Sequence, residues 1–250
     1  MTESLSPDML RQAFHEVVAS RRTIRAFLPD PVPQEVLDRC LESALMAPSA
    51  SNLQPWEFIV IRDPELRQRA NAVCLNQRGP ATAPLMVALV AHRDICKRHC
   101  DFILQTLQER GILRKSQERY WGRIMPLIFT YGPFGLFGVI KKAISRMGSL
   151  WKPMPNLYSR ADVRVLTHKS TALAAATFML ALRAEGYDSC PMEGFDPWRA
   201  RKLLKLPRGA EVCMFLAIGK RAEGGLWWDR MLVPKEWVVQ DPGEDMGGKP

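Results

Sequence analysis

Three guanidinium groups and a hydroxyl occur within five consecutive residues near the N-terminus of this 250-residue chain. A guanidinium group is planar, permanently charged and able to donate several hydrogen bonds at once, so arginine clusters are typical of phosphate-binding sites. A cluster of this kind, taken by itself, is also common on a solvated surface. The residues concerned are Arg21, Arg22, Thr23 and Arg25.

A second polar motif runs from Pro48 to Trp56 and leads into the apolar segment 57–61. Small hydroxyl and amide side chains allow both backbone and side chain to approach the polar edge of a flat heterocycle. A simple helix-to-strand turn would use the same residue types. Together with the arginines, the motif indicates the phosphate end and the ring end of one nucleotide-like cofactor. Its polar and turn-forming residues are Pro48, Ser49, Ser51, Asn52 and Gln54.

Later motifs continue this pattern in a fixed order: Asn76, the sequence Pro-Met-Glu-Gly-Phe-Asp at 191–196, and an apolar strand at 211–219. In this order the motifs resemble the FMN-dependent nitroreductase family, and the resemblance covers residues 10–93 and 165–239. It implies an α+β fold in which helices wrap a central, mainly antiparallel sheet. It also implies an interlocked homodimer.

The resemblance gives the two N-terminal motifs their roles. Arg21 and Thr23, with Arg22 beside them, would hold the FMN phosphate or ribityl chain. Arg25 would lie near the N1–C2=O edge of the ring, where a cation stabilises the anionic reduced flavin. The 48–56 motif would reach the flavin with contributions across the dimer, shaped by Asn52 and Gln54.

The later motifs receive roles in the same way. Asn76 would hydrogen-bond the polar edge of the ring, although an asparagine close to glycine is also common in turns. Backbone N–H groups at Glu193 and Gly194 would face flavin N5, because glycine permits close approach. Arg230 would contact the phosphate, while Trp228 stands where the family often has a second basic residue. The segment that faces N5 comprises Pro191, Met192, Glu193 and Gly194.

Apolar periodicity and cap residues predict the elements that position these motifs. We expect a single domain over 1–242 with a variable insertion at about 94–164, and a disordered tail at 243–250. Residues 220–240, which are rich in tryptophan, are expected to be exchanged between subunits. Helices are expected at 7–20, 33–47, from 63, at 167–185 and 197–206, and strands at 57–61, 85–91, 188–190 and 212–218.

Composition bounds the remaining possibilities. The chain is 47% apolar and 24% charged, which is ordinary for a globular protein. Its six cysteines and the lack of an export signal at the N-terminus predict buried, reduced thiols and a cytoplasmic location. The compact set His92, Cys96, His99 and Cys100 has no second ligand pair, so we expect no metal site.

The net charge of +9 is concentrated in the insertion. Residues 109–169 hold twelve Lys or Arg and three Asp or Glu, which accounts for the whole excess. Within them, residues 124–140 carry no charge. This segment is expected either to form a lid or hairpin over the active site, or to join a peripheral membrane contact through residues 124–151. Lipid contact would make a hydrophobic quinone an attractive substrate.

The sequence therefore predicts an FMN-dependent oxidoreductase that uses NAD(P)H. Hydride would pass through flavin N5 to a nitroaromatic, quinone or related conjugated acceptor by a ping-pong mechanism, with no catalytic side chain. One alternative keeps the fold but changes the chemistry to reductive dehalogenation or flavin remodelling. The other is a non-catalytic, basic protein that binds a membrane surface or nucleic acid; within the favoured interpretation no nucleic-acid partner is expected.

Overall fold

The computed structural model describes residues 6–130, 136–153 and 159–241. Its centre is a four-stranded sheet in the order β1-β2-β4-β3, and every neighbouring pair is antiparallel. The predicted α+β class with a central antiparallel sheet is therefore confirmed. The strands are β1 (Trp56–Ile61), β2 (Leu85–His92), β3 (Asp188–Met192) and β4 (Ala210–Gly219).

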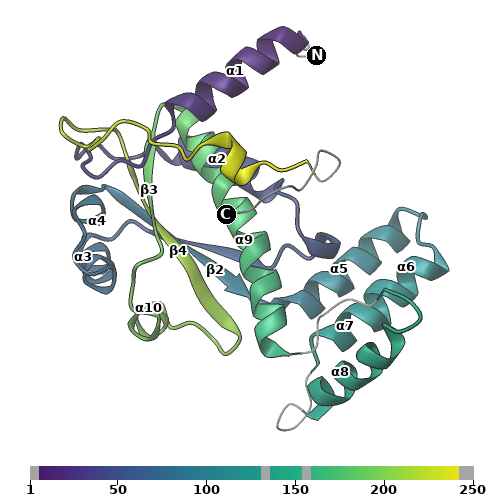
Figure 1. Cartoon of the computed structure of the whole chain (residues 1–250). Helices are drawn as coiled ribbons and strands as arrows, with labels where there is room; N and C mark the ends of the chain where they lie inside the picture. The colour runs from purple at the N-terminus through teal and green to yellow at the C-terminus, as the bar shows by residue number, and fades with distance from the viewer. Residues whose placement is uncertain (1–5, 131–135, 154–158, 242–250) are drawn as a thin grey trace.

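Helices cover both faces of the sheet, which gives three layers (Figure 1). Alternate residues of β2 point to opposite faces, so Met86 packs in one core cluster and Leu85 in the other. Because both faces are covered, every residue of β2 is buried. The first face is covered by α3 (Pro64–Val73), α4 (Arg78–Thr82) and α10 (Pro197–Leu203), and the second by α2 (Gln34–Leu45) and α9 (Arg160–Ala184).

Short polar side chains begin several helices, as their sequences predict. Ser6 caps α1 (Pro7–Ser20), and Asp63 caps α3, each by accepting a hydrogen bond from a first-turn backbone N–H. Ser159 and Asp162 form a capping box at the start of α9. The prediction placed the start of this helix at Thr167, but the helix begins earlier, at Arg160. The helices α2 and α10 end earlier than predicted, at Leu45 and Leu203.

The alanine-rich helix α9 is a core element. Phe178 is fully buried, and its ring meets the ring of Phe58 edge-to-face at 5.6 Å. Ala174 and Ala175 are also fully buried, which lets neighbouring elements approach closely. In the described part of the chain, α9 is the one helix long and apolar enough to cross a membrane, by length and composition only. Its packing against α2 and the sheet identifies it as an internal helix instead.

The regular secondary structure in the described part of the insertion is helical, and the insertion lies beyond the N-terminal end of α9 (Figure 1). The described part of 124–140 forms α7 and the start of α8, and the lid or hairpin expected there stays a prediction. Residues 131–135 lie outside the described chain. The elements are η2 (Arg93–Ile95), α5 (Cys96–Glu109), α6 (Lys115–Arg119), the π-helical turn η3 (Tyr120–Ile124), α7 (Met125–Ile128) and α8 (Leu136–Gly148).

Two terminal segments expose apolar side chains. No residue of α1 is buried, and Leu10 and Phe14, spaced along one face, are exposed. The arm after β4 also exposes Trp228 and Trp237, the latter in the short α11 (Lys235–Val238). Exposed aromatic and aliphatic surface of this extent is typical of sites that contact another protein or a membrane. The exchange of this arm stays a prediction, and the tail at 243–250 lies outside the described residues.

Candidate functional site

The arginine motif and the C-terminal arm line one cavity of about 310 Å³. The guanidinium carbon of Arg25 lies 4.7 Å from the centroid of the Trp227 ring, a cation–π contact. Arg22 donates a hydrogen bond to the backbone carbonyl of Trp228. These contacts fasten the arm over residues 21–25. Trp227 is thus a site residue that the sequence placed only in the arm.

Arg230 lies on the same cavity and caps the end of α1. Its Nη2 donates to the backbone oxygens of Ala19 at 3.0 Å and Arg21 at 2.7 Å. A cation at this position is favourable, because the last carbonyls of a helix lack partners and carry partial negative charge. These hydrogen bonds therefore hold the Arg230 guanidinium group close to the Arg21 side chain.

The residues that line the cavity carry more positive than negative charge. The pKa of Arg21 is lowered by burial and then by the neighbouring cations Arg230 and Arg22, against the attraction of Asp188. Among the described residues, Arg21, Arg22, Arg25 and Arg230 form no ion pair, although Asp229 also lines the cavity. We call these four residues the arginine cluster. A partly buried cluster of this kind favours a bound anion.

A backbone bridge beside a buried carboxylate holds the arginine motif against β3. Asp188 is 4% exposed and lies between Arg183 on α9 and Arg221 after β4, at 3.3 and 3.1 Å. The next residue, Ser189, pairs with Thr23 in an isolated parallel bridge. The arginine motif is thereby fixed beside the strand that leads into Pro191–Gly194. From the sequence, Asp188 was predicted only as a strand residue, with no role in the site.

The later motifs converge on the same region. Gln77, next to Asn76, donates from Nε2 to the backbone oxygen of Gly194 at 3.1 Å. Asn76 itself adopts a left-handed φ of 54°, as its turn interpretation predicted. Glu193 and Gly194 are exposed, and within the described residues their backbone N–H groups have no hydrogen-bond partner. Two accessible amide donors therefore stand at the end of β3.

The loop at 48–56 has a conformation of its own. Ser51, Asn52 and Gln54 adopt left-handed φ values of 55°, 54° and 46°. Ser49 Oγ accepts from the backbone N–H of Gln54 at 3.0 Å, and Gln54 Nε2 donates to Asn52 Oδ1 at 3.2 Å. Strained backbone stabilised by internal bonds is common in ligand-binding loops. Pro48 opens the loop and is exposed.

Two aromatic side chains of the insertion contact this loop at Ser51. Trp121 Nε1 donates to the backbone oxygen of Ser51 at 3.1 Å, and the Tyr120 hydroxyl lies 2.6 Å from Ser51 Oγ. Asn52 and Gln54 line a second cavity of about 340 Å³ with α5 residues that include Arg98. The other α5 residues on this cavity are His99, Phe102 and Ile103.

The cysteines and histidines of this region act in packing. Cys96 and Cys100 are fully buried beside Leu53, and burial raises the pKa of the Cys100 thiol to about 11. The Nδ1 atom of His99 lies 2.7 Å from the backbone oxygen of Leu53, and that of His92 lies 3.0 Å from Glu57 Oε1. In the ranges that the structure covers, no three His, Cys, Asp or Glu residues are grouped to hold a metal ion.

Within one chain, the polar loop and the arginine cluster lie at different points along α9. Ser170 on α9 meets the loop at the backbone N–H of Ala50, at 3.4 Å. Arg183, on the same helix, meets Ser20 beside the arginine motif at 3.1 Å. The interval from Ser170 to Arg183 corresponds to about 20 Å of helix. Within a single chain, the expected phosphate and ring ends therefore belong to different regions.

Solved structures share this fold. The structure of ydfN from Bacillus subtilis, assigned as a nitroreductase, matches with a TM-score of 0.73 and 22% identity, covering 92% of this chain and 99% of that one. A protein of Exiguobacterium sibiricum with the same assignment, solved in complex with FMN, matches with a TM-score of 0.67 and 21% identity, over 96% of this chain and 99% of that one. The fold is thus that of the nitroreductases.

Sequence comparison gives the family. The model of the Nitroreductase family matches residues 18–220. A "NADH dehydrogenase" of Thermus thermophilus is 31% identical over 219 residues, which cover 88% of this chain and 91% of the relative. The chain therefore belongs to the nitroreductase family, and it is an oxidoreductase of that class.

Proposed function

We propose that the chain binds FMN and uses it to pass hydride from NAD(P)H to a conjugated acceptor such as a nitroaromatic compound or a quinone. The observation that carries the proposal is the arginine cluster, a set of four guanidinium groups with no ion pair in the described chain. Its donors match a phosphate in charge and geometry. A related structure of this fold holds FMN, which supports the same cofactor here.

The residues around the cavity fit such a cofactor. Arg21 has the fewest competing contacts of the cluster, since Arg22 and Arg230 already donate to backbone carbonyls and Arg25 lies on Trp227. Arg21 is therefore the principal phosphate ligand, with Arg22, Arg230 and Thr23 beside it. Arg25 supplies positive charge towards the ring. The unpartnered amides of Glu193 and Gly194 offer hydrogen-bond donors at the reacting edge.

When bound, FMN supplies reversible acceptance of hydride, so the protein needs no nucleophile or acid of its own. The chain's part is to hold the ring, to place donors beside it and to keep one face open for the two substrates in turn. A ping-pong order follows if NAD(P)H and the acceptor use that same face. Water or a backbone donor provides protons. The cytoplasm, where NAD(P)H is available, is the proposed location.

A homodimer completes the site in this proposal. The polar loop, with Ser49, Asn52 and Gln54, lies about 20 Å along α9 from the arginine cluster of the same chain. A two-fold pair of chains brings the loop of one copy to the cluster of the other. The exposed apolar faces of α1 and of the C-terminal arm are the surfaces available for that contact.

The test is an FMN titration of the wild type and of Arg21→Ala, followed by flavin absorbance and fluorescence. Loss of a charge-assisted contact to phosphate should weaken FMN binding about 10- to 100-fold. Arg11→Ala is the matched control, because Arg11 lies on α1 in an exposed pair with Asp8. Equal affinity for all three proteins would reject Arg21 as the phosphate ligand.

The same preparations separate the alternative chemistries. A yellow protein bleached by NAD(P)H and reoxidised by a nitroaromatic or quinone supports the proposal. Bound FMN without turnover of any such pair would favour reductive dehalogenation or flavin remodelling. A colourless protein that takes up no added FMN would reject a flavin enzyme altogether.

A further inference from the structure

The helix α8 is oriented with its polar side towards the protein and its apolar side towards solvent. Ser145 is 3% exposed, whereas Ile144 and Met147 are 60% and 63% exposed. The pattern fits an amphipathic helix, in which residues 141 and 145 share one face and residues 140, 144 and 147 share the other. Core-packing helices have the opposite arrangement, so α8 is not placed to bury its apolar face within its own chain.

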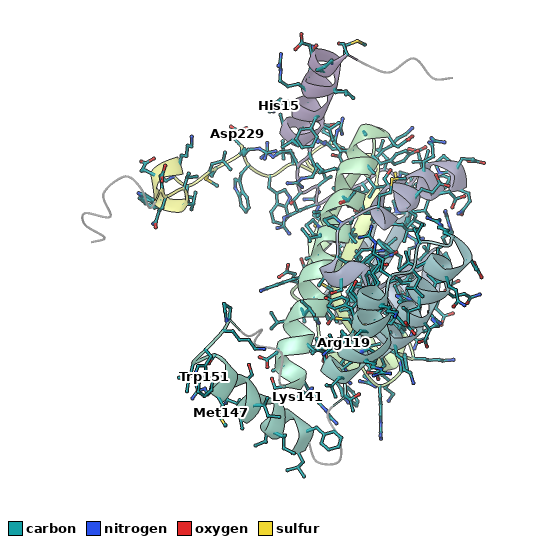
Figure 2. The ribbon with its side chains drawn as sticks, turned by 90° about the vertical axis from the view of Figure 1, so that its right-hand side faces the viewer. His15, Arg119, Lys141, Met147, Trp151 and Asp229 are labelled. Atoms are coloured by element: carbon teal, nitrogen blue, oxygen red, sulfur yellow. The ribbon has the colours of Figure 1, made fainter. Side chains whose placement is uncertain are left out.

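The apolar surface continues beyond the end of the helix. Leu150 and Trp151 are 76% and 79% exposed. Figure 2 shows Met147 and Trp151 together on the outside of the molecule, at the opposite end of α9 from His15 and Asp229. We call this surface the outer face of α8. It comprises Leu136, Val139, Ile140, Ile144, Met147, Leu150 and Trp151.

Basic side chains border the outer face. Lys142 and Arg146 are exposed on α8, and Lys152 follows Trp151. They belong to the segment 109–169, whose excess of positive charge equals that of the entire chain. Apolar residues flanked by lysine and arginine are typical of helices that lie in the interface of an anionic membrane, with the rings and aliphatic chains below and the cations at the headgroups. Trp151 suits the same depth, because indole prefers the interface.

The inward side of α8 fixes this orientation. Lys141 Nζ donates to the backbone oxygens of Leu127, Ile128 and Thr130 at 3.2, 3.0 and 2.9 Å. These carbonyls end α7, where a cation is favourable. The contact prevents α8 from rotating to turn its apolar face inward. Burial lowers the pKa of Lys141, in line with its position between the two helices.

We propose that the outer face of α8 docks the protein on an anionic lipid surface. Charge favours this occupant over a second copy of the chain, since a second basic insertion would repel the first whereas anionic headgroups attract it. Each basic residue close to such a surface strengthens the attraction to it. The helix lies along the bilayer surface and does not span it, as its 13 residues are too few to cross.

The test is co-sedimentation of the full chain with vesicles of phosphatidylcholine alone and of phosphatidylcholine mixed with phosphatidylserine. We expect binding to the mixed vesicles, a loss of at least about tenfold in affinity for Ile144→Glu, and weakening by high salt. Trp151→Ala should weaken binding several-fold. Trp198→Ala is its matched control, because Trp198 on α10 is equally an exposed tryptophan outside the insertion, and it should bind as the wild type does.

The opposite results are equally clear. Absence of binding to mixed vesicles at low salt would overturn the proposal, as would equal losses from Trp151→Ala and Trp198→Ala. Sedimentation velocity supplies a second readout. Suppose that the wild type does not bind vesicles and self-associates, and that Ile144→Glu abolishes the self-association. This result would assign the outer face to a second copy of the chain and reject the lipid surface. Circular dichroism of each variant confirms that the fold is retained.

Discussion

The helices α9 and α8 are both rich in apolar residues, yet they use them in opposite ways. In α9 the large side chains Phe178 and Leu182 are fully buried between the sheet and α2. In α8 the large side chains face outward and Ser145 faces inward. The longer helix satisfies the length and composition of a membrane span, but the shorter one presents its apolar surface.

This difference shows that the apolar content of a helix does not determine whether its apolar side is buried in the core or exposed. The decisive information is which side carries the polar groups and what those groups contact. In α9, Arg183 turns towards Ser20 and Asp188 and fixes the helix to the sheet. In α8, Lys141 contacts the carbonyls that end α7 and leaves the apolar side uncovered.

The largest effect should come from truncating the buried face of α9. Phe178→Ala removes a fully buried ring that packs edge-to-face on Phe58, so it should lower the free energy of unfolding by about 3–5 kcal/mol. Ile144→Ala, on the outer face of α8, should change it by less than about 0.5 kcal/mol. Urea denaturation followed by circular dichroism measures both. A large loss for Ile144→Ala would mean that α8 is packed and would break the comparison.

A smaller effect should come from the charge that holds α9. Asp188→Asn leaves Arg183 and Arg221 without their carboxylate and should cost about 2–3 kcal/mol. This cost is set below that of breaking a fully buried ion pair, because both guanidinium groups are partly exposed to solvent. Because Asp188 precedes Ser189, which pairs with Thr23, FMN affinity should fall together with stability. Unchanged stability in the same denaturation experiment would show that the buried carboxylate is not needed to hold α9.

The smallest effect concerns pH. The pKa of His168 on α9 is lowered from 6.5 by burial and by Arg164, against the attraction of Glu211. Below 6.5 the unfolded chain therefore binds more protons than the folded one, and stability falls as the solution is acidified. His168→Gln should lose less stability than the wild type between about pH 7 and pH 5. Parallel pH profiles for the two proteins would place His168 outside this effect.

Much of the fold could be predicted because local and global signals agree there. The strand at 85–91 is an unbroken apolar run, and the structure buries it on both faces. Caps such as Ser6 and Asp63 mark real helix starts. The start of α9 was missed because its first turns, before Thr167, mix charged and apolar residues without a clear period, and only the Ser159–Asp162 capping box marks them.

The site could be predicted in part. Motif order brought together the arginine motif, Asn76 and Pro191–Gly194. The structure places the arginine motif beside β3 and places Gln77, the neighbour of Asn76, on Gly194. It did not reveal Trp227 over Arg25 or Asp188 between two arginines, because these contacts join residues far apart in sequence. Sequence also gives no orientation for α8, since that depends on the Lys141 contact with α7.

The spacing that α9 imposes between Ser170 and Arg183 has a genetic consequence. If each site joins the arginine cluster of one subunit to the polar loop of the other, a defect in either part inactivates every site in a uniform population. A cell that makes both defective forms assembles mixed pairs, and each mixed pair keeps one intact combination. With random assortment, about a quarter of all sites would be restored. Two inactive alleles of a single gene would then complement each other.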